Sequence, residues 1–292
     1  MDKRIGVEPR IRTKDSESVD RILYVPVMDE DLLGEYEKTS FAHEGLTRPL
    51  YKRGSGPGIV VMHEIPGLYP PVIEFADRLV AAGYRVYLPE LVGQAGRPFS
   101  NAYLLQSMAK ACIAREFHVL ASRGSSPITT WLRALARKAH AECGGPGIGC
   151  IGMCLTGNFG LALMVDDFVM APVLSQPSLP FPFGARRKRA LHVSDEDLEV
   201  IRERTRDGRC PVLGLRFTGD PLCPPERFQR LREELGDGFE AIEIDSSKGN
   251  AAGISRMAHS VVTKDLIDEE GHPTRAALDR VMSFFDEQLR DV

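Results

Sequence analysis

The stretch Ile148-Gly-Cys-Ile-Gly-Met-Cys-Leu-Thr-Gly157 decides the fold class of this sequence. Residues 148–153 form a short apolar run that is typical of a buried strand, and small or apolar residues follow Cys154 directly, as at the start of a helix. A tight turn from a strand into a helix, with a reactive residue at its tip, requires small flanking residues. Gly152 precedes Cys154 by two positions and Gly157 follows it by three. The stretch therefore predicts a strand that ends at a candidate nucleophile.

Cys154 also has a purely structural interpretation, because free cysteine is among the most buried residue types. The reactive interpretation gains support from the helix that is predicted to follow, since the N-terminus of a helix favours a thiolate over a thiol. The pattern around Cys154, taken alone, leaves both interpretations open.

Strands and helices alternate on either side of this stretch. Predicted strands cover residues 22–27, 47–51, 58–62, 84–88, 148–153, 168–174, 211–217 and 239–244. Predicted helices cover residues 71–82, 102–120, 128–142, 155–165, 194–205, 225–235 and 274–289. Apolar strands that alternate with helices form parallel sheets that are buried on both faces. We therefore expect an α/β fold with a mostly parallel central β-sheet and helices on both faces.

The chain divides into a short tail and one large domain. The polar residues 1–20 are predicted to form a flexible N-terminal segment, and residues 21–292 a single domain. The segment 175–209 begins rich in proline and is predicted to be a lid or an insertion.

Composition excludes several classes of protein. With 43% hydrophobic and 27% charged residues, the chain is not expected to be disordered. A net charge of -4 argues against a nucleic-acid binder, and no apolar run reaches the roughly 18 residues that a membrane span needs. The N-terminus lacks the apolar stretch of a signal peptide, so we expect a cytoplasmic protein without nucleic-acid or membrane partners. Nothing in the sequence indicates an oligomeric state.

Metal and nucleotide sites are also not expected. The six cysteines show no C-x-x-C pair and no zinc-type spacing with histidine, and in a chain without a secretory start they are expected to be reduced. Residues 147–152 fit the pattern G-x-G-x-x-G, but these glycines lie before and within the strand rather than in the turn after it. We expect neither a metal nor a cofactor.

Two later residues complete a candidate catalytic set with Cys154. In open α/β sheets, ligands bind beyond the carboxyl ends of the strands. Asp220 follows the predicted strand 211–217, and His259 follows the last predicted strand. A nucleophile needs a base that moves its proton and an acid that orients the base, and Asp220 and His259 supply both. Taken alone, Asp220 is equally well a turn former and His259 a surface histidine.

The sequence resembles the dienelactone hydrolase branch of the α/β-hydrolase fold. Five pieces carry the resemblance, in order, over about residues 20–290: His63-Glu-Ile-Pro-Gly67, Tyr84 to Glu90, Gly152-Met-Cys-Leu-Thr-Gly157, Gly219-Asp-Pro221 and Ala258-His-Ser260. The resemblance implies an α/β-hydrolase fold and a catalytic triad of Cys154, Asp220 and His259.

The resemblance also assigns roles around the triad. It implies that Glu64 contacts the resting thiol and helps to form the thiolate when substrate arrives, although Glu64 could instead cap the next helix. The oxyanion hole is expected to consist of the backbone N–H groups of Ile65 and Leu155.

Two departures from the family pattern bear on the substrate. Thr156 stands where the family usually has glycine, so its bulk could loosen the turn or its hydroxyl could bond locally and support it. The family holds a substrate carboxylate with arginines. The candidates here are Arg97, Arg115 and Arg256, of which Arg256 is favoured because it precedes His259 by three residues.

Three functions remain open at this point. The leading hypothesis is a cofactor-free cysteine hydrolase that cleaves an enol lactone or a related activated ester through a thioester. The second keeps the triad but changes the small-molecule substrate to a general carboxylester or thioester. The third is a non-catalytic binding protein with an α/β-hydrolase scaffold.

Overall fold

The computed structural model describes residues 32–113, 127–206 and 208–290. Its centre is an eight-stranded sheet in the order β1-β2-β4-β3-β5-β6-β7-β8. The strands are β1 (Glu37–His43), β2 (Leu46–Arg53), β3 (Gly58–Met62), β4 (Arg85–Pro89), β5 (Ile148–Met153), β6 (Val169–Ser175), β7 (Val212–Phe217) and β8 (Phe239–Ile244). The strand β2 runs antiparallel to both of its neighbours, and the strands from β4 to β8 pair in parallel.

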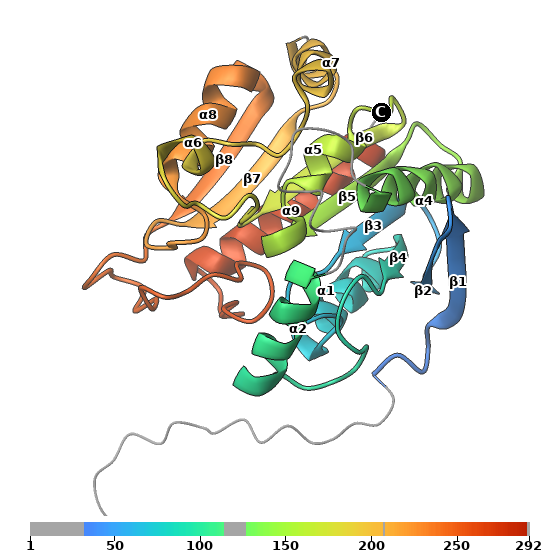
Figure 1. Cartoon of the computed structure of the whole chain (residues 1–292), viewed down its shortest axis with the longest axis horizontal. Coiled ribbons are helices and arrows are strands. Elements are labelled where there is room, and N and C mark those ends of the chain that lie inside the picture. The colour runs from blue at the N-terminus through green and yellow to red at the C-terminus, as the bar shows by residue number, and fades with distance from the viewer. Residues whose placement is uncertain (1–31, 114–126, 207, 291–292) are drawn as a thin grey trace, which may run out of the picture.

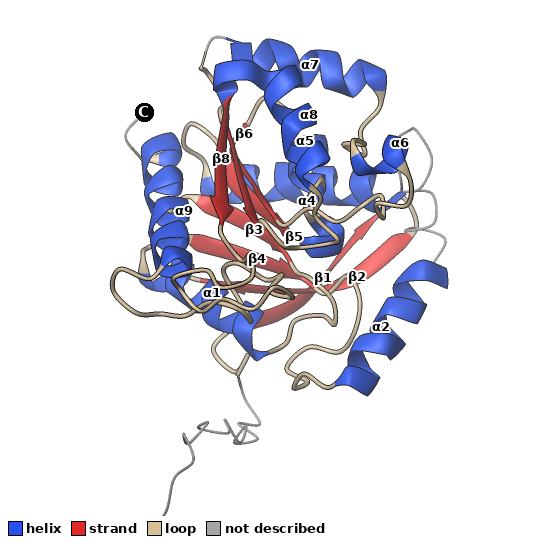
Figure 2. Cartoon of the chain, turned by 90° about the vertical axis from the view of Figure 1, so that its left-hand side faces the viewer, coloured by secondary structure: helices blue, strands red, loops and turns tan. Residues whose placement is uncertain are grey.

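Helices cover both faces of this sheet (Figures 1 and 2). The helices α1 (Pro70–Ala81) and α9 (Pro273–Leu289) pack on one face. The helices α4 (Pro127–Cys143), α5 (Phe159–Leu163), α7 (Asp195–Arg206) and α8 (Pro225–Leu235) pack on the other. Two shorter or peripheral helices, α2 (Asn101–Ile113) and α6 (Ala185–Lys188), complete the set described.

The strand β3 shows why the sheet is buried on both faces. All five of its residues are buried, and neighbouring side chains alternate between the two helical layers. Val60 and Met62 belong to one apolar cluster, whereas Ile59 and Val61 belong to the other. A strand with two buried faces has to be apolar at every position, which is why its sequence is a continuous hydrophobic run.

The predicted α/β fold class is confirmed by this architecture, with two differences in detail. The structure adds an edge strand, β1, that sequence reasoning did not predict, because its polar and apolar residues do not form a hydrophobic run. The single helix predicted for 155–165 is instead a 3₁₀ turn, η2 (Cys154–Thr156), followed by the short α5. The predicted strand 22–27 and the segment 1–20 lie outside the described residues. No helix in the described ranges combines the length and apolarity needed to span a membrane.

Candidate active site

Cys154 lies at the tip of the turn between β5 and η2. Its φ is 55°, a left-handed value that non-glycine residues rarely adopt. A Cβ atom on Gly152 would lie 2.2 Å from the carbonyl oxygen of Thr156, and a Cβ atom on Gly157 would lie 2.4 Å from the Cα atom of Pro177. Both positions therefore need glycine. The tight turn leaves Cys154 partly exposed at the carboxyl edge of the sheet.

Thr156 supports this turn through its side chain. Its Oγ1 atom accepts a hydrogen bond from the backbone N–H of Met153 at 2.9 Å and donates to the carbonyl oxygen of Met62 at 2.7 Å. The hydroxyl therefore ties the end of β3 to the turn after β5. Of the two effects that the sequence left open for Thr156, the structure shows the supporting one.

Two backbone N–H groups lie on the segments that the Thr156 hydroxyl joins. Ile65 lies in the buried loop after β3, and Leu155 directly follows Cys154. Within the described part of the chain, neither N–H donates a hydrogen bond. Both N–H groups are therefore free of protein acceptors in the described structure, as the predicted oxyanion hole requires.

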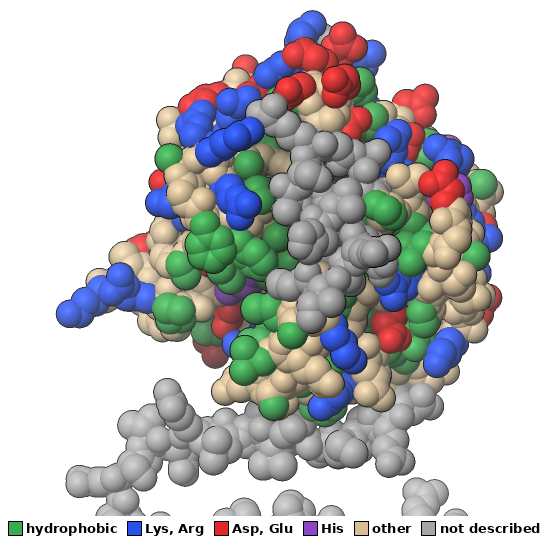
Figure 3. Space-filling model, viewed as in Figure 1, with side chains coloured by type: hydrophobic (Ala, Val, Ile, Leu, Met, Phe, Trp, Pro, Cys, Tyr) green, Lys and Arg blue, Asp and Glu red, His purple; other side chains and the backbone are tan. Residues whose placement is uncertain are grey.

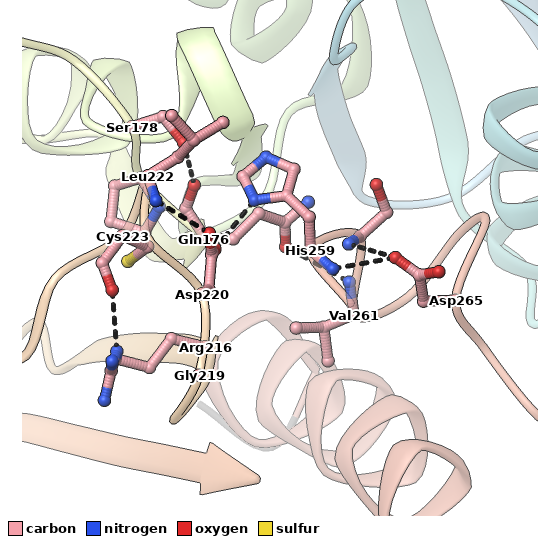
Figure 4. A network of polar contacts seen from close by, with 12 residues as sticks. Gln176, Ser178, Arg216, Gly219, Asp220, Leu222, Cys223, His259, Val261 and Asp265 are labelled. Atoms are coloured by element: carbon pink, nitrogen blue, oxygen red, sulfur yellow. Dashed lines mark hydrogen bonds and ion pairs between the residues drawn. The ribbon is translucent and has the colours of Figure 1, made fainter. Parts of the chain in front are cut away.

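Asp220 and His259 meet at the end of β7, as Figure 4 shows. The Nδ1 atom of His259 lies 2.7 Å from the Oδ2 atom of Asp220. Asp220 is only 3% exposed, and its other carboxylate oxygen accepts a hydrogen bond from the N–H of Leu222 at 2.9 Å. With Asp220 accepting at Nδ1, the neutral ring carries its proton there and leaves Nε2 as the basic nitrogen.

The Nε2 atom of His259 is buried, and it has no hydrogen-bond partner among the described residues. Burial lowers the pKa of His259, but the negative charge of a Cys154 thiolate and the hydrogen bond to Asp220 raise it by more. The net pKa lies well above the ordinary value of 6.5. Cys154 and Asp220 are thus the two groups that raise the pKa of this ring.

Separate contacts hold the loops that carry Asp220 and His259. The buried Arg216 side chain, on β7, donates to the carbonyl oxygens of Cys223 and Thr218, one on each side of Asp220. The Oδ2 atom of Asp265 accepts hydrogen bonds from the N–H groups of His259 and Ser260, at 2.8 and 2.9 Å. Both loops are thus fixed independently of the bond between the catalytic side chains.

Glu64 is buried between these loops and is 1% exposed. Its Oε1 atom accepts hydrogen bonds from the hydroxyls of Tyr69 and Thr263, both at 2.5 Å. Its Oε2 atom accepts from the Ser260 hydroxyl at 2.6 Å and from the Gln176 amide at 3.2 Å. The Cys154 thiol, which the family resemblance assigns to Glu64 as a contact, is not among its hydrogen-bond partners in the described structure. Glu64 also caps no helix there, since the N-cap of α1 is Tyr69.

His63, next to Glu64, is a structural histidine. Its Nδ1 atom lies 2.8 Å from the carbonyl oxygen of Glu64, and its Nε2 atom accepts a hydrogen bond from the N–H of Leu91 at 2.9 Å. Complete burial lowers the pKa of His63 to about 4, so the ring is neutral near pH 7. Both ring nitrogens are occupied, which excludes a role as the catalytic base.

Two of the three candidate arginines lie in the described part of the chain, and both are exposed. Arg97 is exposed, and its guanidinium lies 4.2 Å from the centre of the Tyr103 ring. Arg256 is exposed in the loop that carries His259. Arg115 lies outside the described residues.

The start of the predicted lid, residues 177–190, is fixed in place by the fully buried Arg227 of α8. The guanidinium donates to four carbonyl oxygens in this segment: those of Pro177, Pro180, Arg187 and Ala190. At its near end, the N–H of Ser178 donates to the carbonyl oxygen of Cys154 at 2.9 Å. The segment is therefore a wall attached to the turn at Cys154.

Apolar side chains are exposed on segments next to the site. Phe183, in the wall segment, is 75% exposed, and Met257, two residues before His259, is 74% exposed. Figure 3 shows hydrophobic side chains gathered beside a histidine on this face, with lysine and arginine side chains nearby. Among the described residues, no group of three or more His, Cys, Asp and Glu side chains could hold a metal ion.

Comparison with known families identifies the chain. A model of the dienelactone hydrolase family matches residues 47–289. The chain belongs to the dienelactone hydrolase family. Family membership makes it an ester-cleaving hydrolase of the α/β-hydrolase superfamily. Among curated protein sequences, none matches this chain significantly.

Solved structures of this family have the same fold. A dienelactone hydrolase from Anabaena variabilis is 12% identical, with a TM-score of 0.55 over 88% of this chain and 100% of that one. A dienelactone hydrolase-like promiscuous phosphotriesterase from metagenomic libraries is 18% identical, with a TM-score of 0.56 over 87% of this chain and 98% of that one. These likenesses establish the fold of the chain.

Sequence reasoning did not find the residues that hold the candidate catalytic groups in place. These are Gln176, Arg216, Arg227, Ser260, Thr263 and Asp265. Gln176 had a usable signal, since it directly follows β6 and therefore lies at the carboxyl edge of the sheet. Arg227 gave no signal, because an arginine within an amphipathic helix is normally a surface residue.

Proposed function

We propose that the protein is a cysteine hydrolase that needs no cofactor and cleaves an enol lactone or a related activated ester through a thioester. Cys154 is the proposed nucleophile, His259 the base and Asp220 the residue that orients the base. Family membership supports the reaction class. The positions of the three residues at the carboxyl edge of the sheet support the assignment of roles.

The single observation that carries the proposal is the state of the His259 ring. One nitrogen lies 2.7 Å from Asp220, while the other is buried without a partner among the described residues. A buried imidazole nitrogen that is left unpaired costs free energy, so it is expected to serve a reacting group. Cys154 also raises the pKa of this ring, which supports the sulfur as that group.

The reaction can be written as two transfers of the acyl group. The Cys154 thiolate adds to the substrate carbonyl, and the N–H groups of Ile65 and Leu155 stabilise the resulting oxyanion. The carbon–oxygen bond then breaks, and the His259 imidazolium protonates the departing enolate. A water molecule, deprotonated by the now neutral His259, attacks the thioester; the carbon–sulfur bond breaks and the acid leaves, which restores the Cys154 thiolate and the His259 imidazolium.

A second candidate is a hydrolase of neutral carboxylesters or thioesters with the same triad. The observation that favours it is the exposure of the apolar Phe183 and Met257 on segments that carry site residues, while Arg97 and Arg256 are themselves exposed rather than buried. An apolar edge suits an ester with an apolar acyl or leaving group better than an anionic lactone.

Initial rates on a dienelactone and on a short aryl ester test both candidates, with wild type, Cys154→Ala and Arg256→Ala. The proposal expects fast cleavage of the lactone, its loss in Cys154→Ala, and a weaker preference for the lactone in Arg256→Ala. If only the aryl ester is cleaved, and Cys154 is required, the second candidate is correct. Turnover that survives in Cys154→Ala would exclude both.

We also propose a cytoplasmic location and a small-molecule substrate as the partner. The support for the location is that Cys143, Cys150, Cys154, Cys210 and Cys223 are all free thiols, a state that persists in a reducing compartment.

A further inference from the structure

The carboxylate of Glu64 is buried and bound by neutral donors. An ionised carboxylate offers about four lone-pair positions, and the hydroxyls of Tyr69, Ser260 and Thr263 and the amide of Gln176 supply four donors. Three of these contacts are 2.5 or 2.6 Å long, as expected for hydrogen bonds to a charged acceptor. No lysine or arginine in the described residues forms an ion pair with it. These donors are therefore what stabilises the buried charge.

The donors come from separate parts of the chain. Tyr69 belongs to the same loop as Glu64, and Gln176 directly follows β6. Ser260 and Thr263 lie in the loop after β8, where Ser260 directly follows His259. Glu64 itself lies in the loop after β3, where it directly precedes Ile65, one of the two proposed oxyanion donors. One carboxylate thus connects the loop of the oxyanion hole to the loop of the base.

Gln176 strengthens the same connection. Its amide nitrogen donates to Glu64, while its Oε1 atom accepts a hydrogen bond from the N–H of Val261 at 3.3 Å. Its backbone is left-handed, with a φ of 36°, which is uncommon for a residue with a side chain. The strained backbone at Gln176 therefore places a buried side chain that bridges Glu64 and the His259 loop.

We propose that Glu64 is a positioning residue whose carboxylate fixes the His259 loop relative to the Ile65 N–H, and is not a proton acceptor for Cys154. The inference rests on the proposed function, because it assigns Glu64 a part in the same reaction. To accept the thiol proton, the carboxylate would have to give up at least one of its four donors. As a fixed anion it instead sets the distance between the base and the oxyanion hole, on which the rate depends steeply.

The test compares two variants that each remove one donor from an intact carboxylate with one variant that changes the carboxylate itself. The variants Ser260→Ala and Thr263→Val each delete one hydroxyl, and Glu64→Gln removes the charge. The control is Thr205→Val, which deletes a buried hydroxyl in α7 that bonds only within its own helix. Two quantities are measured for each: kcat and KM on an aryl ester, and the rate at which iodoacetamide alkylates Cys154 at pH 6.5.

We expect each hydroxyl variant to lower kcat by roughly 10-fold or more, since a displacement of about 1 Å at a catalytic group can cost about 100-fold. KM should stay within about twofold, because the substrate itself does not contact Glu64. Alkylation of Cys154 should slow in parallel, since it depends on His259. Ser260→Ala combined with Glu64→Gln should cost less than the product of the two single effects, because both changes break the same contact.

Two results would overturn the proposal. If both hydroxyl variants keep the wild-type kcat and alkylation rate while Glu64→Gln loses them, the carboxylate acts directly on the thiol. If Glu64→Gln also behaves like Thr205→Val, Glu64 has no part in catalysis. If Glu64→Gln does not fold, the hydroxyl variants alone test the proposal, because wild-type kcat and alkylation rates in both of them overturn it. Failure of the proposed function is recognised separately, as turnover that persists in Cys154→Ala, and the alkylation rates then still test the positioning role.

Discussion

The Nδ1 atom of His259 lies 2.7 Å from the Oδ2 atom of Asp220, and each residue is held by its own loop contacts. Leu222 fixes the carboxylate through its N–H, and Asp265 fixes the backbone of His259. This arrangement sets the tautomer and the orientation of the ring before substrate arrives. Substitutions that remove these contacts have consequences that can be measured.

Asp220→Asn should lower kcat by roughly 100-fold or more while leaving the fold intact, because correct placement and protonation of a general base contribute about 10²–10⁴-fold. The asparagine removes one of the two negative charges that raise the pKa of His259. The imidazolium then becomes less stable, so the pH dependence of Cys154 alkylation should shift to higher pH. Alkylation by iodoacetamide between pH 5 and 9 measures the shift. An unchanged profile would show that Asp220 does not control the ring.

Thr156→Val should destabilise the fold by about 1–3 kcal/mol, because it leaves the buried N–H of Met153 without an acceptor and the carbonyl oxygen of Met62 without a donor. Thr156→Ser keeps the hydroxyl and should cost about 0.8 kcal/mol, the value of one buried methyl group. Urea unfolding gives both free energies. Equal losses in the two variants would mean that the methyl group, and not the hydroxyl, supports the turn.

Arg227→Met should release the segment 177–190 from α8. Four carbonyl oxygens lose their donor, of which that of Pro177 is buried and the others are partly buried, and we expect the free energy of unfolding to fall by about 3 kcal/mol. The exposed Arg186 and Arg187 make the release visible, because trypsin should cleave after them faster in the variant. Arg230→Met, a half-exposed residue of the same helix, is the matched control. Equal cleavage rates in the two variants would contradict the attachment.

His63 should make the fold sensitive to acid. Burial lowers its pKa to about 4 from 6.5, so between these pH values the unfolded chain binds a proton that the folded protein does not. Its contribution to stability is complete above pH 6.5 and is lost as the pH falls towards 4, a change of about 3 kcal/mol. Urea unfolding of wild type and His63→Gln at pH 7, 5.5 and 4.5 isolates this contribution. Parallel pH dependences would exclude it.

Much of this fold was predictable from the sequence, because a strand with two buried faces has to be hydrophobic throughout. The same strands gave the approximate places of Cys154, Asp220 and His259, since each follows a strand end. The edge strand β1 escaped prediction, because one solvated face gives no continuous apolar run. The helix after Cys154 was predicted too long, since the tight turn continues as a 3₁₀ turn before α5 begins.

The supporting contacts could not be predicted, because they join residues that are distant in the chain. Arg227 binds the carbonyl oxygen of Pro177 across 50 residues, and Gln176 reaches Glu64 across 112. The local sequence pattern around a residue carries no information about partners that are so distant in the chain. Glu64 is an example. The family resemblance implies a contact with the Cys154 thiol, whereas in this chain the carboxylate accepts hydrogen bonds from four other side chains.

The large sequence separation between Glu64 and two of its hydrogen-bond donors has a consequence for the synthesis of the protein. Glu64 and Ser260 are 196 residues apart, and Glu64 and Thr263 are 199 apart. A chain that leaves the ribosome N-terminus first can pair β1 to β6 long before these hydroxyls emerge. During that interval Glu64 lacks two of its four donors, and the proposed base His259 is also absent. In the proposed mechanism, Cys154 therefore becomes an activated nucleophile only after the loop that follows β8 has been synthesised.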